Sequence, residues 1–594
     1  MNEQIDKGGK PTVVKRCCRW LFGWRTIRRA LIGLACFATV VALFYTEENW
    51  RGKRAWENCK HELEAKGVVL DWSAYIPPPV PDNQNFFKAP GINEADWVGR
   101  GSREFTKHLS SASQSSNNPM LVAELKVVPS NTKLDVENGG TILRLEDSDA
   151  RKQAEQLIRA ILGPSAVGTR GFYPLIARPL NQVQPAVAVV PLDKMHTAQE
   201  ILKIFPDTIE GSHVQIKLAS ANSFSVFLSP PPIAARDYLQ ASDASKADFD
   251  NLRKALERPY TRIDGDYTQP ATMPIPNFIT MRTVAQILAE RAKCYLLLGQ
   301  PDKGLRELTL LHDVCRVLES KPTGKPMTLV AAMINVAITR LYTDTVTDGM
   351  RLQTLREPQL AVIENQLSEI NLLPYVFSAF EQEPAAVCRT LEISPASKLA
   401  AMFFFDPPNP NLKEKLKNPT YFLIRWMPRG WVYQNMVNIA MSHQKIAESF
   451  EPASNLVLPR KAEMANGEIG QLALRHGPYT FLAAITLPNY TKATQRLAYN
   501  QTSANETLLA CALERFRLAR GEFPETLDAL TPQFIEKLPH DLIGGQPLHY
   551  RRTDDGKFLL YSIGWNEKDD GGEVALNKEG KEDLENGDWV WSAK

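Results

Sequence analysis

The residues best suited to chemistry lie in an acid-rich stretch close to the C-terminus. Residues 562–594 hold nine acidic side chains against four lysines, and residues 566–572 read NEKDDGG. A Ca²⁺ ion takes six to eight oxygen ligands, and flexible loops rich in Asp, Asn and Gly can supply them. An acidic surface loop without a metal has the same composition, and it is the simpler interpretation.

Histidines also come close to carboxylates at two places in this region. His540 precedes Asp541, and His549 lies near Asp554 and Asp555. Such clusters can act as general acids and bases, but turns use the same residue types, and we favour the turn. The sequence contains no serine-hydrolase, zinc-protease, phosphate-loop or dinucleotide-binding motif. No reaction is predicted, although catalytic groups from distant segments can still meet in a fold.

The eight cysteines do not form a disulfide framework in a chain of this length. Five of them follow the apolar segment described below: Cys59, Cys294, Cys315, Cys388 and Cys511. Because five is odd, at least one of these thiols is unpaired or intermolecular. None has the spacing of a metal site. Cys294 and Cys315 could form one bond across a helical hairpin, but buried, unreactive thiols are expected.

One apolar segment determines where all these residues lie. Residues 30–45 read ALIGLACFATVVALFY, without a charge. As a helix they extend about 24 Å at 1.5 Å per residue, enough to cross a thin bilayer with help from flanking aromatic residues. We therefore predict a single transmembrane helix at 30–45, with the lipid bilayer as one partner.

The charges around this segment predict its orientation. Residues 1–29 carry eight Lys and Arg against two acids, while Glu47 and Glu48 follow the segment. By the positive-inside rule, residues 1–29 form a basic cytoplasmic segment and the C-terminal ectodomain lies across the membrane. Signal peptides share this pattern. Because no small-x-small cleavage site follows Val41, we expect an uncleaved anchor.

Changes in the spacing at which apolar residues recur, and in proline content, divide the rest of the chain into four parts. Residues 46–119 comprise a charged helical stalk, which ends near Gly67, and then a proline-rich strap with a polar loop. Short alternating strands make residues 120–232 a small α+β module. Residues 233–489 form a helical domain, and residues 490–594 return to helix, turns and strands.

The net charge argues against one class of partner. The whole chain carries +2 and residues 1–29 carry +6, which leaves −4 for residues 30–594. A near-neutral, slightly acidic ectodomain lacks the basic surface that nucleic acid requires. We therefore expect a protein partner and no nucleic acid.

The clearest unit of the helical domain is residues 283–320. Two apolar-striped helices there are joined by a short turn at residues 299–302. The unit resembles a tetratricopeptide hairpin, and the positions that carry the resemblance are Ala292, Tyr295, Gly304 and Leu305. Helical arrays of that class present a concave surface to a peptide or protein. Residues 327–349 and 358–373 could form a second hairpin, but no clean 34-residue repeat occurs, so an ordinary helical core stays open.

A second apolar stretch, residues 421–441, has the length of a membrane span. It holds Arg425, Pro428 and Arg429, and each arginine near the centre of a span costs at least ~2.5 kcal/mol. Proline also interrupts the helical hydrogen bonds, so we reject a second span. Because Trp426 lies among these cations, docking on the membrane surface is the alternative to a buried core segment.

The C-terminal part resembles a known family. A helix from about Tyr490 is followed by ARGEFPETLDAL, LPHDLIGGQPLHY and LLYSIGWNEKDDGG. This order resembles the soluble domain of a type II secretion major pseudopilin, of the type IV pilin class, over about residues 505–591. The resemblance implies a pseudopilin-like α+β cap at residues 490–594. It also implies calcium ligands, which by position are Ser562, Asn566, Asp569, Asp570 and Asp588.

The chain departs from that family in two ways. Asn566 replaces an aspartate, Glu567 a glycine and Leu542 a proline, and these changes weaken the calcium expectation. More than 400 residues separate the apolar segment from the C-terminal part, and no pilin processing signature precedes it. A conventional filament subunit is therefore not expected.

The whole chain resembles large bacterial membrane-anchored proteins without an assigned activity. The shared stretches are ENWRGKRAWE, IPPPVPDNQNF and ALERFRLARGEFPETLDAL. This resemblance implies an inner-membrane protein with a periplasmic ectodomain. We expect a mainly α fold with α+β parts that serves as an envelope scaffold or protein-binding protein, linked to secretion or pilus machinery. The alternative is an envelope hydrolase with an unrecognised site. No cofactor is expected other than the calcium considered above.

Overall fold

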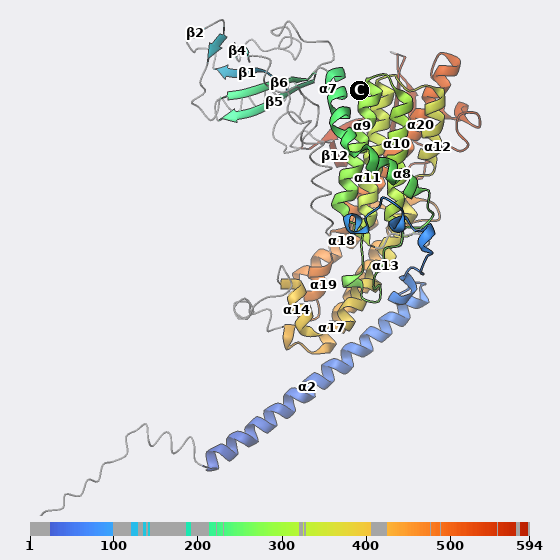
Figure 1. The fold of residues 1–594 in the computed structure, drawn as a ribbon. Helices are drawn as coiled ribbons and strands as arrows, with labels where there is room; N and C mark the ends of the chain where they lie inside the picture. The colour runs from blue at the N-terminus through green and yellow to red at the C-terminus, as the bar shows by residue number, and fades with distance from the viewer. Residues whose placement is uncertain are drawn as a thin grey trace, which may run out of the picture. The chain divides into compact units, whose positions relative to one another are not determined.

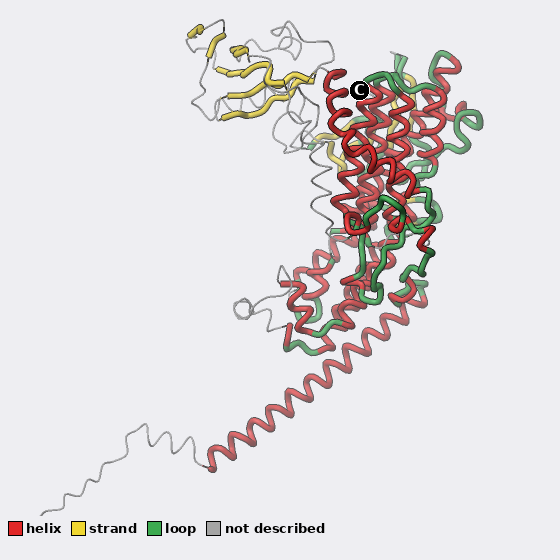
Figure 2. Tube along the Cα trace, in the orientation of Figure 1, coloured by secondary structure: helices red, strands yellow, loops and turns green. Residues whose placement is uncertain are grey.

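A computed structural model shows a mainly helical protein with small β-sheets (Figures 1 and 2). The predicted fold class is confirmed at this level. The structure describes residues 24–98, 120–128, 135–137, 140–142, 186–191, 213–220, 223–229, 231–319, 325, 328–404, 424–475, 477–487, 489–554, 556–577 and 582–591.

The chain divides into two compact units, each built from separate stretches of sequence. Unit 1 comprises Met1–Asp71, Pro384–Ser442 and Glu468–Pro488. Unit 2 comprises Trp72–Glu383, His443–Gly467 and Asn489–Lys594. Each unit is described by itself below.

Helix α2 (Trp24–Ala65) contains the predicted transmembrane segment. Leu34, Phe37 and Leu43 in that segment are each more than 60% exposed. By its length and its composition, the helix is long and apolar enough to cross a membrane. It continues without a break into the predicted stalk and ends before Gly67, whose φ of +85° lies in the left-handed region.

One other described helix, α11 (Leu329–Arg351), meets the same length and hydropathy criteria. Of its apolar window, 61% is buried inside the protein, which is typical of a core helix. The rejected span at 421–441 is described from residue 424 onward and contributes to α17 (Arg429–Ala447). Met436 and Ile439 of α17 are buried, as in a core helix.

Beyond its apolar segment, α2 directs one stripe of residues toward the rest of unit 1. The buried members of this stripe are Glu48, Gly52, Trp56, Cys59 and Leu63. At Gly52 the helix crosses the start of α17. A Cβ on Gly52 would overlap the backbone of Gly430, and a Cβ on Gly430 would overlap the backbone of Glu48. Only glycine permits so close an approach of two backbones.

The crossing is surrounded by hydrogen bonds to the buried Glu48. Trp431 Nε1 and the Tyr479 hydroxyl each donate to Glu48 Oε2 at 2.9 Å, and Arg51 donates to Oε1 at 3.0 Å. The N–H of Gly430 donates to Asn49 Oδ1 at 2.8 Å. A carboxylate is tolerated in this buried position because a guanidinium group and two aromatic side chains donate hydrogen bonds to it.

Unit 2 contains the predicted helical hairpin at residues 283–320. It consists of α9 (Phe278–Leu297) and α10 (Pro301–Val314), which lie side by side (Figure 1). Gly299 forms the turn with a φ of +67°. Gly304 allows the helices to pack closely, because a Cβ there would lie 3.0 Å from Leu296.

The helices expected for a second hairpin are present as α11 and α12 (Glu357–Ser368), but they do not pack on one another as α9 and α10 do. Helix α9 packs on α11, and the long α20 (Tyr490–Arg520) packs on both α11 and α12. The remaining described α-helices are α3 (Glu94–Trp97), α7 (Pro231–Ser242), α8 (Lys246–Leu256), α13 (Leu372–Ile393), α14 (Ala396–Phe404), α18 (Pro459–Leu474) and α19 (Phe481–Thr486).

The proline-rich strap packs on the helical part of unit 2. Phe86 and Phe87 are buried in the same core as residues of α8 and α9. The N–H of Phe86 donates to the carbonyl of Tyr260 at 2.7 Å, and Arg258 donates to the carbonyl of Asn85 at 2.9 Å. The segment is therefore a strap fixed to the helices after α8, and not a free spacer.

A four-stranded sheet lies within the predicted α+β module of residues 120–232. Its order is β4-β1-β6-β5, with β1 parallel to β4 and antiparallel to β6. A separate pair joins β2 and β3. The strands are β1 (Met120–Val128), β2 (Asp135–Glu137), β3 (Gly140–Ile142), β4 (Ala186–Pro191), β5 (His213–Ser220) and β6 (Ser223–Ser229).

The C-terminal part follows the predicted order of helix, turn and strands. Helix α20 ends at Gly521, whose φ of +90° caps it, and the short helix that follows is the 3-10 turn η10 (Leu527–Leu530). An antiparallel sheet in the order β13-β10-β9 and the pair β11-β12 complete the region, and a further pair, β7-β8, precedes α20 in the sequence. The strands are β7 (Phe450–Glu451), β8 (Leu456–Val457), β9 (His549–Arg552), β10 (Phe558–Ser562), β11 (Val574–Leu576), β12 (Glu582–Gly587) and β13 (Trp589–Val590).

We predict that Gly430→Ala separates α2 from α17. The added methyl group overlaps the backbone at Glu48, and overpacking of this kind costs about 1–3 kcal/mol or more. Hydrogen exchange of the α17 amides in the full chain should become faster. The matched control is Gly470→Ala in α18, where a Cβ has no neighbour within 4 Å. Unchanged α17 exchange in Gly430→Ala would contradict the close crossing.

Candidate functional site

The five residues considered as calcium ligands lie at one end of the C-terminal sheet. Ser562 ends β10, and the loop after it contains Asn566, Asp569 and Asp570. Asp588 precedes β13, the strand that pairs with β10. All five residues therefore belong to one corner of the fold.

Asp588 is buried, and main-chain donors occupy both of its carboxylate oxygens. The N–H groups of Asp570 and Gly572 donate to it at 3.2 and 2.6 Å. Burial raises the pKa of this carboxyl group, and the two N–H groups oppose that rise. Asp588 therefore holds the loop in shape by accepting main-chain hydrogen bonds.

The exposed loop residues also bond to one another. Asp569 Oδ1 accepts hydrogen bonds from the N–H of Gly571 at 2.9 Å and from the hydroxyl of Tyr561 at 3.0 Å, and these bonds lower the pKa of Asp569. Asn566 donates to Asp570 Oδ2 at 2.9 Å. Over the described residues, no group of three or more His, Cys, Asp or Glu could hold a metal ion. Calcium binding here stays a prediction.

His540 and Asp541 belong to a turn, as expected. Asp541 is buried and accepts hydrogen bonds from the N–H groups of Ile543 and Ile563 at 3.0 and 3.2 Å. His540 Nε2 lies 3.0 Å from the carbonyl oxygen of Ser454. The two side chains are thus used to fix the main chain.

His549 has a different carboxylate neighbour from the one that its spacing suggested. Its ring stacks on Tyr561 with 4.8 Å between centroids, and Nδ1 lies 3.5 Å from Asp569. The ion pair that the structure shows for His549 is therefore with Asp569, and Asp555 lies outside the described residues. Strand pairing sets this contact, because His549 is opposite Tyr561 in the register of β9 and β10.

The described cysteines are free thiols. The bond considered between Cys294 and Cys315 is not formed, and buried thiols, the expected state, are found at four positions: Cys59, Cys294, Cys388 and Cys511. Burial raises the pKa of Cys59 to about 11 and raises that of Cys294 further. These thiols are protonated and unreactive near neutral pH.

A polar cavity that the sequence did not predict lies in unit 2 among α10, the turn after it, α11, the connection from α12 to α13 and the start of α13. Its volume is about 530 Å³, which is in the range of ligand pockets. The polar residues that line it are His312, Asp313, Cys315, Arg316, Glu319, Asn335, Thr339, Tyr342, Glu369, Asn371 and Tyr375.

Two tyrosines of this cavity are fixed by hydrogen bonds. The Tyr342 hydroxyl donates to Gln366 Oε1 at 2.7 Å, and the Tyr375 hydroxyl donates to the carbonyl of Leu318 at 2.9 Å. Burial raises the pKa of both phenols well above the ordinary value. They are therefore neutral hydrogen-bonding groups at any physiological pH and not proton acceptors.

The remaining titratable groups do not include an activated nucleophile. His312 Nδ1 lies 3.2 Å from Asp313 Oδ1, and the His312 ring is 5.6 Å from that of Tyr342. Burial raises the pKa of the Cys315 thiol, although a hydrogen bond with Thr339 opposes the rise. Because cysteine attacks as a thiolate, this thiol is not activated.

The charge of the cavity is negative. Asp313, Glu319 and Glu369 line it together with a single arginine, Arg316, when His312 is neutral. Carboxylates around a hollow attract cations and N–H donors. A ligand with an ammonium or guanidinium group fits this lining better than an anion.

The sequence contains one signal that could have located the cavity. Asn335, Thr339 and Tyr342 occur at i, i+4 and i+7 on one largely buried face of α11. Polar residues on the core face of a helix need buried partners. In the structure that face forms a wall of the cavity.

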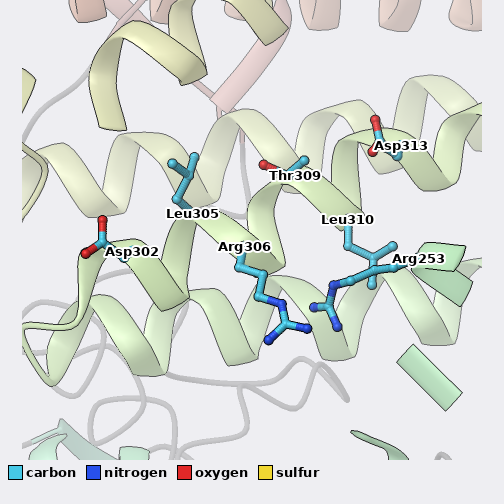
Figure 3. A pocket seen from close by; sticks show the side chains of 7 residues that line it. All are labelled: Arg253, Asp302, Leu305, Arg306, Thr309, Leu310 and Asp313. Carbon is cyan, nitrogen blue, oxygen red and sulfur yellow. The ribbon is translucent and has the colours of Figure 1, made fainter. Parts of the chain in front are cut away.

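A second hollow, of about 450 Å³, runs along the neighbouring face of α10 (Figure 3). Asp313 lines both hollows. Arg253 and Arg306 extend into the second hollow near one another, as Figure 3 shows. Each is already paired with a carboxylate, Arg253 with Glu307 at 2.6 Å and Arg306 with Asp250 at 3.0 Å. We assign no ligand to it.

Comparison of the chain with known protein families, curated proteins and solved structures found no match. The cavity and the acidic loop must therefore be interpreted from their own geometry and chemistry.

We predict that Asp588→Ala loosens the acidic loop with or without calcium. Two main-chain donors lose their acceptor, at a cost of about 1–3 kcal/mol. Hydrogen exchange at Asp570 and Gly572 should therefore become faster in the full chain, in calcium and in chelator alike. Asp583→Ala, which removes an exposed acceptor for Glu585, is the matched control and should leave these two amides unchanged. Slower exchange of the wild-type loop in calcium would instead favour a metal site.

Proposed function

We propose that this chain is a membrane-anchored scaffold or binding protein of the bacterial cell envelope, and that its polar cavity receives part of a protein partner. The observation that carries the proposal is the cavity of about 530 Å³ held among packed helices of unit 2. Helical arrays commonly present hollows and concave surfaces to peptides and proteins.

The lining of the cavity supports binding by a basic side chain of the partner. Asp313, Glu319 and Glu369 offer carboxylate oxygens, and a charge-assisted hydrogen bond to a carboxylate is about twice as strong as a neutral one. Tyr342 and Tyr375 add aromatic rings next to these acids, which attract a cation through their faces. A lysine or arginine of the partner would use both features.

The proposed location has separate supports. The length and apolar character of α2 support a membrane anchor. The excess of Lys and Arg in residues 1–29 supports a cytoplasmic N-terminus and an ectodomain on the other side. The bacterial inner membrane and the periplasm rest on the resemblance to envelope proteins alone.

The link to secretion or pilus machinery is the finest part of the proposal. It is supported by the order of a long helix, a short 3-10 helix and an antiparallel sheet in the C-terminal region. The same order resembles that of the pseudopilin soluble domain. A pseudopilin-like cap on an anchored helical protein would suit a component that contacts such machinery without entering the filament.

A photo-crosslinking experiment tests the binding proposal. We expect a photoreactive residue in place of Asn371, at the cavity, to capture a protein from the native envelope, because Asn371 lines the hollow and is exposed. Mass spectrometry identifies the captured protein. The matched control is the same residue in place of Val330, which is exposed on α11 and does not line the cavity. Capture of the same proteins at both positions, or of none, would count against the cavity as the binding site. Secretion or pilus components in the first sample would support the finer proposal.

An envelope hydrolase is the second candidate, and one observation favours it. His312 and Asp313 lie 3.2 Å apart in a cavity that also contains Cys315. A histidine oriented by a carboxylate is one part of a catalytic triad. The raised pKa of the Cys315 thiol argues against its use as the nucleophile.

We predict that the full chain does not hydrolyse envelope peptides, esters or glycans, and that His312→Ala changes nothing in this assay. His61→Ala is the matched control, because His61 is exposed on α2 far along the sequence from the cavity. Turnover that is present in the wild type and in His61→Ala, but absent in His312→Ala, would overturn the binding proposal in favour of the hydrolase.

A further inference from the structure

A segment more than 380 residues later in the sequence contacts the outer end of the apolar part of α2. The Tyr45 hydroxyl donates to the main-chain oxygen of Trp426. The ring of Phe44 meets that of Trp431 edge-on, with 6.3 Å between centroids. These contacts lie within unit 1, so they fix the level of residues 426–431 along the axis of α2.

This level is where the proposed membrane ends. The uncharged segment runs to Tyr45, and the first charges beyond it are Glu47 and Glu48. The hydrocarbon core of a bilayer ends where a spanning helix changes from apolar to charged residues, and tyrosine and tryptophan concentrate there. Trp426 is therefore held at the depth of the lipid headgroups.

The exposure of Trp426 needs an explanation. The side chain is 69% exposed, next to an exposed arginine, Arg425. A large aromatic ring is unfavourable in water but suits the interface, where one part of it is apolar and its N–H meets water and headgroups. Arginine beside it can bind lipid phosphate through its planar fork of donors.

We propose that Arg425, Trp426 and Met427 form an interfacial loop that lies among the lipid headgroups beside α2, on the side of the ectodomain. This proposal rests on the membrane anchor of the proposed function, and it adds a second membrane contact that holds unit 1 at the bilayer surface. The occupant of the exposed surface is the headgroup layer of the same bilayer that α2 crosses.

The other exposed tryptophan of this region lies at a compatible level. Trp50 is 57% exposed, and Arg54 stacks over it at 5.3 Å. It is five residues beyond Tyr45, which is about 7.5 Å farther along the helix. Each headgroup layer is about 5–7.5 Å thick, half of the amount by which the full bilayer exceeds its hydrocarbon core, so Trp50 reaches the outer limit of that layer. Trp50 and Trp426 thus belong to one aromatic belt.

The surrounding contacts make this loop a fixed one. Gly430 is in backbone contact with α2, and its N–H donates to Asn49. Arg429 donates to the carbonyl of Ser394 at 3.1 Å and to the carbonyl of Leu391 at 2.8 Å. The side chain of Trp426 can be replaced without breaking any of these bonds, because Tyr45 bonds its main-chain oxygen.

Depth-dependent fluorescence quenching tests the proposal. An environment-sensitive label is attached at Trp426→Cys in the full chain, with Cys17, Cys18, Cys36 and Cys315 changed to serine, and the protein is placed in vesicles of phosphatidylcholine and phosphatidylglycerol. We expect strong quenching by lipids that carry a spin label on the headgroup. Quenching by aqueous iodide should be several-fold weaker than for a label in water.

Two positions on α2 calibrate the depth. Phe37→Cys, 66% exposed in the middle of the apolar segment, should be quenched by lipids that are spin-labelled deep in the acyl chains. His61→Cys, with a side chain 79% exposed, should be quenched only by iodide. It lies sixteen residues beyond Tyr45, about 24 Å along the helix and still about 18 Å at a tilt of 40°.

The outcomes separate this proposal from the one on which it rests. If the label at residue 37 is not quenched by deep lipid probes, the membrane anchor itself fails. If residue 37 is deep but residue 426 behaves like residue 61, the anchor stands and the interfacial loop is overturned. A label at residue 426 that is shielded from iodide and not quenched by headgroup probes would show a protein contact, which also overturns it.

Discussion

The organisation of unit 1 depends on the close crossing of α2 and α17 at Gly52 and Gly430. Two backbones at this distance leave no room for a side chain on either helix. Their approach also places Glu48, one turn before Gly52, in a buried position. A buried carboxylate is costly without donors, and here two aromatic donors and Arg51 supply them. Shape and charge at the crossing therefore require each other: the glycines permit the approach, and the donors to Glu48 make it stable.

Unit 2 is specified by buried polar contacts between helices as well as by its apolar core. Tyr342 of α11 donates to Gln366 of α12, and Gln366 donates to Thr309 of α10 at 2.8 Å. Because a buried polar group without a partner costs about 1–3 kcal/mol, this chain of bonds selects one register of the three helices. Asn335 and Thr339 lie on the same face of α11, beyond this series of hydrogen bonds, and they line the cavity. The cavity is thus a continuation of the polar contacts that align these three helices.

Local signals in the sequence predicted the elements well and their partners poorly. The ends of α2 and α20 were predictable because Gly67 and Gly521 adopt a left-handed conformation, which few other residues do at low cost. The crossing at Gly430 was not predictable, because a single glycine in an apolar stretch does not reveal which helix approaches it. The acidic loop shows the same limit. Its composition predicted oxygen-rich side chains, but not that Asp588 uses both oxygens on the main chain. Such pairings are set by strand register and helix packing, which span distant residues.

In the segment around Trp426, the same side chains are favourable or unfavourable according to how deep in the bilayer they lie. Arginine is costly in hydrocarbon, and that cost excludes a second span at 421–441. At an interface the same arginine and tryptophan side chains are favourable. The sequence does not show where this segment lies relative to the bilayer, so it allowed both a core segment and a surface segment. Contact with α2 supplies the depth and separates the two tryptophans: Trp431 donates inward to Glu48, while Trp426, five residues earlier, is exposed where the apolar segment ends. The two interpretations therefore apply to different residues of the segment. Trp431 packs against α2 as part of the core of unit 1, and Trp426 lies on the surface beside α2.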